Sequence, residues 1–302
     1  MPLTYRQVGA LAIDPASHPR GLSFLSAASG LLRVGERLYV VADDENHLGV
    51  FDADLATPGR LIRLFDGDLP ASPKKRKGQK ADLESLLLLP AATAWPDGAL
   101  LALGSGSRPT RFVGALLPLD AKGEAQGPAQ IIDLTPLYGS LNARFGELNI
   151  EGAFILGDAL MLLQRGSMGG PNAVIRFPLS TVMAWLGGAA VSLQPAAVVE
   201  CDLGRVDGVA LTFTDGAALP DGSWLFSAVA ERTDNAYDDG ACVAAAIGIA
   251  ESDGRLRSMR RLAPTRKIEG IEAQVRGGKI VIGTVTDADN PAIPAELGTT
   301  SW

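Results

Sequence analysis

The chain has 302 residues, of which 47% are hydrophobic and 20% are charged, a composition typical of a globular protein. Its formal net charge of −7 argues against a protein that coats nucleic acid or an anionic membrane, because like charges repel. Cys201 and Cys242 are too few for a disulfide framework and form no CxxC spacing, so we expect two buried free thiols.

The amino terminus, MPLTYRQVGALAIDP, lacks the basic, apolar and small-residue regions of a signal peptide, and we therefore expect a cytoplasmic protein. The most apolar stretch, residues 177–199, is interrupted by Gly187, Gly188 and Pro195, which a membrane-spanning helix would not need. It predicts a short helix that begins at Ser180 and ends at the glycines, followed by an outer strand.

Five segments of the chain share one pattern, in which a small or acidic residue opens an apolar strand, a turn follows, and a second apolar strand comes next. Each segment is therefore expected to form a buried hairpin. In chain order the segments are ASGLLRVGERLYVVAD (28–43), LESLLLLPAATAWPDGALLALGSG (83–106), IEGAFILGDALMLLQRG (150–166), VDGVALTFTDGAALPDGSWLFSAVAE (206–231) and IEGIEAQVRGGKIVIGTVTD (268–287).

A more alternating segment and then a more polar strand follow most of these hairpins, which makes four strands per unit. This repeat predicts a single all-β domain over residues 1–302, a five-bladed β-propeller of four-stranded antiparallel blades. The fifth unit is one strand short, and the amino-terminal strand LTYRQVGALAI is available to close the ring. A six-bladed propeller is the alternative, if residues 44–82 or 112–147 contain another blade.

Equivalent positions of successive blades become neighbours around the channel of a propeller. At the start of each inner strand the alignment places four acids and one hydroxyl, namely Ser29, Glu84, Glu151, Asp207 and Glu269. Four carboxylates this close in a low-dielectric channel repel by several kcal/mol, so they cannot all be bare and ionised.

Three arrangements would relieve this repulsion: protonation, salt bridges or a bound cation. Calcium suits a ring of oxygen ligands, and we expect Glu84, Glu151, Asp207 and Glu269 to bind it. Neither histidine nor a thiolate accompanies these motifs, which argues against zinc and copper. Salt bridges stay open as the alternative, because Arg205 and Lys267 stand two residues before two of the acids.

The loops between the second and third strands of each unit lie on the same face as the acidic ring. Arg108, Arg111 and Arg165 stand there among glycines and serines, and with Lys267 they form a candidate site for an anionic ligand. Ordinary turn chemistry is the other interpretation of these loops. We expect Asp43 and Glu231 to act as general bases, or with Asp287 to extend a metal site.

The basic run KKRKGQK, residues 74–80, resembles a nuclear-localisation or nucleic-acid patch. In an acidic chain it is more simply a solvated loop that leads into the second blade. Because it comes directly before Asp82 and Glu84, it is also placed to lean over the channel mouth and help neutralise the ring. Two histidines leave little room for a serine triad, and the sequence has neither a Walker loop nor a G-x-S-x-G elbow.

Three loops, GSGSRPTR (104–111), NIEGA (149–153) and NAYDDG (235–240), resemble those of a bacterial β-propeller family of unknown function over nearly the whole chain. The repeated EG before an apolar strand is also similar to calcium-activated nucleotidases, five-bladed propellers with calcium in an acidic channel, and to the esterase-like phytase domain. That resemblance implies cation binding by the four ring acids. The sequence departs from it at Ser29 and at Ser85, which follows Glu84 in place of glycine.

Two functions are compatible with these features. The first is a calcium-assisted hydrolase of a phosphate ester or another anionic small molecule, bound at the channel mouth, in which the metal polarises the scissile group. The second is a non-catalytic propeller that binds a ligand or a partner, with an acidic ring that only rigidifies the channel. A deep pocket in which arginines and carboxylates converge would favour the enzyme.

Overall fold

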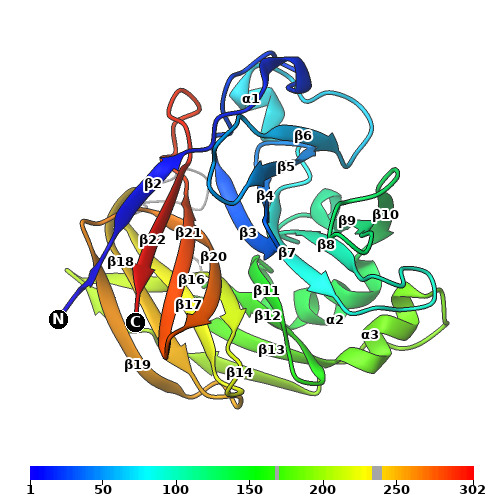
Figure 1. The fold of residues 1–302 in the computed structure, drawn as a ribbon. Coiled ribbons are helices and arrows are strands. Elements are labelled where there is room, and N and C mark those ends of the chain that lie inside the picture. Colours follow the sequence, from blue (N-terminus) through cyan, green and yellow to red (C-terminus); the bar gives the residue numbers. More distant parts are fainter. Residues whose placement is uncertain (167–169, 233–239) are drawn as a thin grey trace.

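The computed structural model describes residues 1–166, 170–232 and 240–302, and the sheets in it form five blades around one channel (Figure 1). The inner strands of consecutive blades pack against one another, and the inner strand of the fifth blade packs against that of the first, which closes the ring. A five-bladed β-propeller is therefore confirmed.

The first three blades each have four antiparallel strands in chain order, counted from the channel outward. The strands of blade 1 are β3 (Ala28–Val34), β4 (Arg37–Ala42), β5 (His47–Asp52) and β6 (Arg60–Arg63). Those of blade 2 are β7 (Leu83–Leu89), β8 (Ala99–Gly104), β9 (Val113–Pro118) and β10 (Gln130–Asp133). Those of blade 3 are β11 (Ile150–Leu156), β12 (Ala159–Gln164), β13 (Asn172–Pro178) and β14 (Ala197–Cys201).

Blade 4 is the largest sheet and carries two additional short strands at its edges. Its strands are β15 (Arg205–Val206), β16 (Val209–Ala218), β17 (Trp224–Arg232), β18 (Ala241–Ala250), β19 (Leu256–Ala263) and, parallel to β19, β1 (Leu3–Thr4). Because β16 and β17 are longer than the inner strands of blades 1 to 3, this hairpin extends beyond the ring of strand starts and carries Glu231 over the channel.

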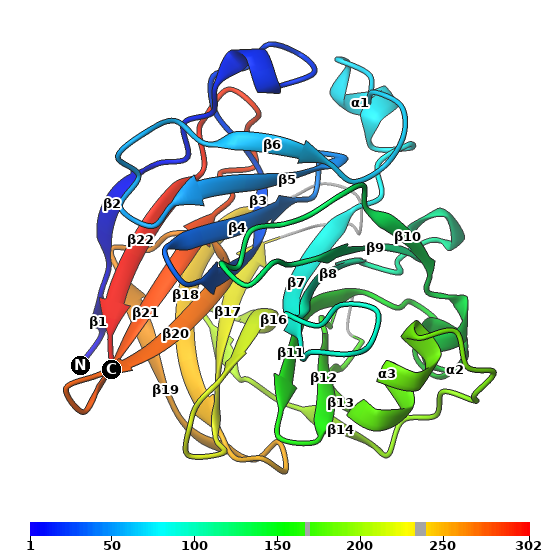
Figure 2. The same ribbon diagram turned by 45° about the vertical axis from the view of Figure 1, so that its right-hand side comes forward.

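The amino-terminal strand closes blade 5, as the sequence predicts. The strands of this blade are β20 (Ile268–Arg276), β21 (Lys279–Thr286), β22 (Glu296–Ser301) and β2 (Arg6–Ala10). β2 pairs antiparallel with β22, so the two ends of the chain lie side by side (Figure 2). This pairing covers the edge that β22 would otherwise leave open.

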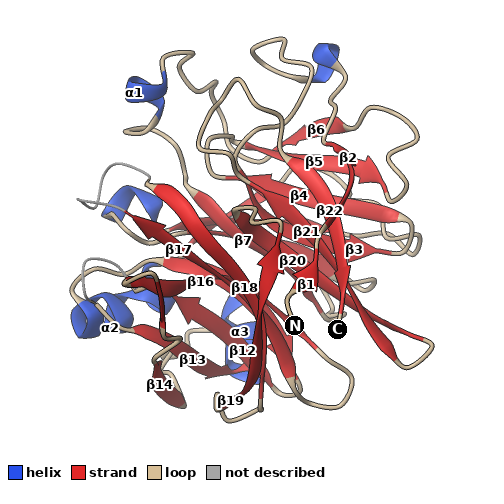
Figure 3. Cartoon of the chain, turned by 90° about the vertical axis from the view of Figure 1, so that its left-hand side faces the viewer, coloured by secondary structure: helices blue, strands red, loops and turns tan. Residues whose placement is uncertain are grey.

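The helices lie at the periphery of the strands (Figure 3). They are α1 (Pro73–Arg76), α2 (Thr135–Phe145), α3 (Leu179–Leu186) and two 3₁₀ turns at Pro15–Ser17 and Pro109–Arg111. The regions 44–82 and 112–147 hold α1 and α2 in place of a further blade, which excludes the six-bladed alternative. α3, followed by the outer strand β14, confirms the prediction for residues 177–199. No described helix is long and apolar enough to cross a membrane.

Five hydrophobic clusters fill the five interfaces between blades. The cluster between blades 3 and 4 is aromatic, and Trp224 packs at 5.3 Å from Phe154 and 5.8 Å from Phe226, measured between ring centroids. Small residues let the inner strands approach closely at the channel end. A Cβ on Gly270 would lie 2.6 Å from the Leu31 backbone nitrogen, a distance that real contacts do not reach.

We predict that Gly270→Ala destabilises the protein by about 1–3 kcal/mol, because the added methyl group meets backbone of the neighbouring blade and cannot be accommodated by a side-chain rotation. Gly139→Ala is the matched control. Gly139 is exposed on α2 with nothing within 4 Å of an added Cβ, and alanine there should stabilise by about 0.5–1 kcal/mol. Urea unfolding of both variants measures the difference, and equal effects would contradict the close-approach account.

Candidate functional site

A cavity of about 1050 Å³ opens at the end of the channel where the inner strands begin. All five blades contribute to its wall, and most of the side chains that line it are charged. Three of the ring acids, Glu84, Glu151 and Glu269, face this cavity together with Ser29. The convergence of carboxylates, arginines and lysines in one deep pocket is the arrangement that the enzyme hypothesis expects.

Each inner strand has a β-bulge at its ring position, at the start of the strand in blades 1, 2, 3 and 5 and in the middle of β16 in blade 4. The strand pairing shifts register at the ring position in every blade, and an extra residue at a bulge is free of the ladder and can be aimed elsewhere. The residues at these bulges are Ser29, Glu84, Glu151, Thr214 and Glu269.

Asp207 does not belong to this ring, which corrects the sequence-based alignment. It lies in the turn between β15 and β16 with an exposed side chain and a φ of 51°. Thr214 occupies the equivalent position in blade 4, and its hydroxyl donates to the Ile268 carbonyl oxygen (3.0 Å) and lies 2.7 Å from Ser227 Oγ. The ring therefore contains three carboxyls and two hydroxyls, and Asp207 lies outside it.

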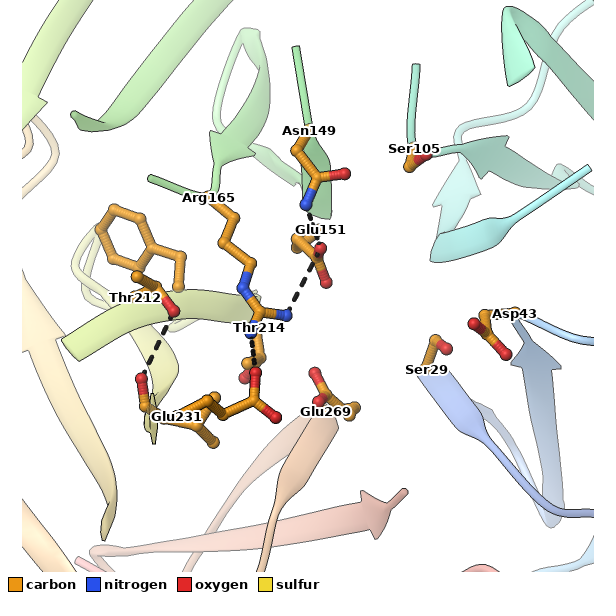
Figure 4. Close-up of polar contacts among 12 residues, drawn as sticks. Ser29, Asp43, Ser105, Asn149, Glu151, Arg165, Thr212, Thr214, Glu231 and Glu269 are labelled. Carbon is orange, nitrogen blue, oxygen red and sulfur yellow. Dashed lines mark hydrogen bonds and ion pairs between the residues drawn. The ribbon is translucent and has the colours of Figure 1, made fainter. Parts of the chain in front are cut away.

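Blades 3, 4 and 5 are joined by a network of ion pairs across the channel mouth, and Figure 4 shows the part of it around Arg165. Arg165 lies between Glu151 (3.5 Å) and Glu231 and forms an ion pair with each. Lys267 contacts the other oxygen of Glu231 (2.9 Å) and also Glu269 (3.4 Å). Two cations are thus shared among three buried carboxyls. The pair of Lys267 with Glu269 is one that the salt-bridge alternative expects, whereas Arg205 is exposed and donates to the Gly208 carbonyl oxygen.

Lys267 also contacts two acids at the end of β21. Its ammonium lies 4.0 Å from Asp287 and forms a closer ion pair with Asp289. Only 9% of the Lys267 side chain is exposed, so the compensating charge is held inside the wall of the cavity.

A second network joins blades 1 and 2. The ammonium of Lys80 forms an ion pair with Asp43 and lies 2.9 Å from Asp82 Oδ1. Arg111 contacts the other oxygen of Asp82 at 2.7 Å, and Ser105 donates a hydrogen bond to the same oxygen. The basic run that precedes blade 2 therefore contributes directly to the site through Lys80, whereas its residues Lys74 and Lys75 are exposed to solvent.

Glu84 lies between the two networks and belongs to neither. Within the described residues its carboxyl forms no ion pair and accepts no hydrogen bond. Burial raises the pKa of Glu84 well above its ordinary value, and the negative charge of Glu151 is the next largest cause. Burial therefore favours the protonated form of this carboxyl, which lines the cavity.

The other carboxyls of the site divide into two classes. Burial raises the pKa of Glu151 and raises that of Glu269 well above its ordinary value, in both cases against nearby cations. Burial also acts on Glu231, but the charges of Arg165 and Lys267 outweigh it and hold the pKa of Glu231 below its ordinary value. Glu231 is therefore the most firmly ionised acid of the network.

The remaining predicted site residues all line the cavity. Arg108 and Arg111 lie on the wall formed by blades 1 and 2, and Arg165 and Lys267 on the opposite wall. Asp43 and Glu231, predicted as general bases, are each bound by cations. Their catalytic role and the ligand-binding role of the four cations stay predictions. Of the loops named from the sequence, NAYDDG (235–240) falls outside the described residues except for Gly240.

Three important residues were not identified from the sequence. The sequence indicates Lys80 only as part of a basic run. Thr214 was missed because the tripeptide VDG (206–208) resembles the IEG of blades 3 and 5 and was aligned with it. Asp215, next to Thr214, is 4% exposed and accepts backbone hydrogen bonds from Gly216 (2.7 Å) and from Ile271 of blade 5 (2.9 Å). Spacing would have revealed Thr214, because it precedes the turn residue Pro220 by the same six positions that separate Glu151 from Gly157.

We predict that Lys267→Met destabilises the protein by about 3–5 kcal/mol, because it leaves Glu269 buried without this ion pair and Glu231 with Arg165 alone. Lys279→Met, the same change at an exposed position of β21, should shift stability by no more than about 0.5 kcal/mol. Denaturant unfolding at neutral pH compares the two. Similar losses for both variants would mean that the network contributes nothing specific.

We also predict a pH-dependent effect of Asp287→Asn. Burial, with smaller contributions from Asp43 and Asp289, raises the pKa of Asp287 to about 7 against the opposing charge of Lys267. The folded protein thus binds this proton more tightly than the unfolded chain, and stability falls as pH rises from about 4 to about 7. Asp287→Asn has no ionisable group at this position and should not show this fall in stability.

The free energy of unfolding of Asp287→Asn, relative to the unsubstituted protein, should therefore increase between pH 4 and 7 and level off above pH 7. Asp158→Asn, at a fully exposed carboxylate, is the control and should show no such trend. A difference for Asp287→Asn that stays constant with pH would contradict the raised pKa.

Known proteins match this chain over nearly its whole length, both by a family model and by structure. A family model described as a family of unknown function (DUF6929) matches residues 24–300. No curated protein matches the chain. Glutaminyl cyclase from Myxococcus xanthus has a similar structure, with a TM-score of 0.50 and 9% sequence identity over 99% of this chain and 98% of that chain.

Two glycosidase structures show a weaker likeness. The GH93 α-L-arabinofuranosidase of Fusarium graminearum with arabinobiose has a TM-score of 0.47 and 12% identity, over 97% of this chain and 85% of that chain. A glycosyl hydrolase from Bacteroides ovatus has a TM-score of 0.46 and 10% identity, over 98% and 88%. At such identities the likeness concerns the fold alone.

Proposed function

Because the chain belongs to the DUF6929 family, whose function is unknown, we propose its activity from its own side chains: it is a hydrolase of a small anionic molecule bound in the channel-mouth cavity. The observation that carries the proposal is Glu84, a carboxyl on the cavity wall that has no cation partner among the described residues and a strongly raised pKa. Such a group suits general acid catalysis at neutral pH.

The neighbouring blade supplies the complementary group. Glu151 faces the same cavity, accepts a hydrogen bond from Asn149 and lies 3.5 Å from Arg165, whose charge favours its ionised form. Two adjacent carboxyls in different environments can divide the acid and base roles of one hydrolysis. Glu84 would donate its proton to the leaving group, while Glu151 would take a proton from the attacking water.

Asp43 and Glu231 are less suited to this proton transfer. Lys80 holds the carboxylate of Asp43, and the lowered pKa of Glu231 makes it a weak base. The proposal therefore assigns proton transfer to Glu84 and Glu151, and keeps Glu231 as the group that fixes Arg165 and Lys267.

The cationic side chains of the wall support an anionic substrate. Lys77, Arg108 and Arg111 line the cavity on the same side as Glu84, and a phosphate or carboxylate group placed there would meet guanidinium donors. We propose this wall as the binding site of the anionic group, next to the carboxyl that protonates the leaving group.

A second candidate is a non-catalytic binding propeller, and the ion-pair networks favour it. Arg165 and Lys267 form ion pairs with Glu151, Glu231 and Glu269. Most of these charges are therefore used in contacts within the protein and not in contacts with a substrate. In that case Glu84 would only shape the cavity, and a ligand would bind without being converted.

We predict that the purified protein hydrolyses members of a panel of phosphate and carboxylic esters, and that Glu84→Gln lowers kcat by about 10²–10⁴-fold, because the amide cannot donate the proton of an acid. The activity of the unsubstituted protein should fall as pH rises through the raised pKa of Glu84. The control is Asp158→Asn, the same kind of change at an exposed turn at the opposite end of the blade 3 inner strand, and it should retain full activity.

Two results separate the candidates. A compound that stabilises the protein against heat but is not hydrolysed would support the binding propeller. Hydrolysis that Glu84→Gln leaves unchanged would contradict the acid role of Glu84.

A further inference from the structure

We propose that the ammonium of Lys80 is the resident cation of the carboxylate cluster formed by Asp43, Asp82 and Glu84, in the position that a divalent metal ion would otherwise take. One oxygen of each of these carboxyls lies within 4.8 Å of the others, a spacing that a single metal ion could bridge. Lys80 forms ion pairs with two of the three.

Backbone and side-chain contacts around α1 fix the position of the Lys80 ammonium. Lys80 follows α1, and its backbone nitrogen donates to the Arg76 carbonyl oxygen (2.9 Å). Arg76 is 5% exposed and is anchored by an ion pair with Asp44 (3.2 Å) and by hydrogen bonds to the backbone oxygens of Pro70 and Ala71. The segment that carries Lys80 is therefore pinned to the loop that carries Asp43.

Only 10% of the Lys80 side chain is exposed, so its charge is poorly screened by water. Burial alone would lower the pKa of Lys80, but the negative charges of Asp43, Asp82 and Glu84 outweigh it and raise that pKa above its ordinary value. Lys80 is thus an ammonium at neutral pH.

Calcium does not fit the cluster as it stands. It requires six to eight oxygen ligands at close range, but the oxygens of Asp43 and Asp82 are already turned toward Lys80. Arg111 holds the second oxygen of Asp82 at 2.7 Å. A divalent ion would also be repelled by an ammonium that cannot leave. The sequence-based expectation of calcium therefore disagrees with the donor set at this position.

The inference has a consequence that can be measured without knowing any substrate. The unsubstituted protein should not depend on divalent ions, whereas a variant without the Lys80 charge leaves Asp43 without this ion pair and Asp82 with Arg111 alone, and together with Glu84 these carboxyls should bind one. The experiment compares thermal unfolding in EDTA and in millimolar calcium chloride for the unsubstituted protein, Lys80→Met and Lys74→Met. Lys74 is exposed on α1, in the segment that leads to Lys80, and is the matched control.

We expect identical melting temperatures in the two buffers for the unsubstituted protein and for Lys74→Met. Lys80→Met should melt at a lower temperature in EDTA and gain a few degrees with calcium. Calcium titration calorimetry should detect one site in Lys80→Met and none in the other two. The double variant Lys80→Met, Glu84→Gln should lose that site.

Calcium stabilisation of the unsubstituted protein that Glu84→Gln removes would overturn the proposal, since it would place a resident metal at the cluster. A folded Lys80→Met that is indifferent to calcium would overturn it as well. If Lys80→Met does not fold, Lys80→Gln provides the same comparison. Because binding and stability are measured, the result is independent of whether the protein is a hydrolase.

Discussion

The architecture depends on one electrostatic constraint: three ring carboxyls meet at the end of a narrow channel, and their charges must be compensated inside the protein. Burial and mutual repulsion raise the pKa values of Glu84, Glu151 and Glu269 together. Arg165, Lys267 and Lys80 supply the positive charge from loops of different blades. The same ion pairs that neutralise the acids therefore also tie neighbouring blades to one another.

The carboxyl charges are not all compensated to the same degree, and this difference makes acid–base chemistry possible at the site. Glu231 is held by two cations and stays ionised, whereas Glu84 lies between the networks without a partner among the described residues. A site whose carboxyls differ in protonation can move a proton, which a fully paired ring cannot do. The proposed hydrolase activity and the proposed role of Lys80 as resident cation both follow from this distribution of charges.

Much of the fold follows from the sequence because a propeller repeats its pattern in every blade. Turns and apolar strands predicted the five hairpins, and the missing strand of the last unit predicted the closure by β2. In the site, Glu84, Glu151 and Glu269 were placed correctly at the channel, since each stands one residue into the first apolar strand of its hairpin.

The errors have physical causes as well. VDG at residues 206–208 imitates IEG, but blade 4 has a longer hairpin, so Asp207 lies in an outer turn and Thr214 takes the ring position. The sequence also did not predict which cation pairs with each acid. Lys80 reaches Asp43 across a blade interface, 37 residues away in the chain, and only the packing of α1 brings them together.

The most direct measurement of the central claim is a pH titration of the glutamate side-chain carboxyls of the unsubstituted protein by carbon-detected NMR, with assignments from single substitutions. Internal compensation predicts that Glu231 titrates below the ordinary range of a glutamate, while Glu84 and Glu269 titrate well above it. If all three titrated together near the value of an exposed glutamate, the ring would be hydrated and the account of a buried, internally neutralised site would be wrong.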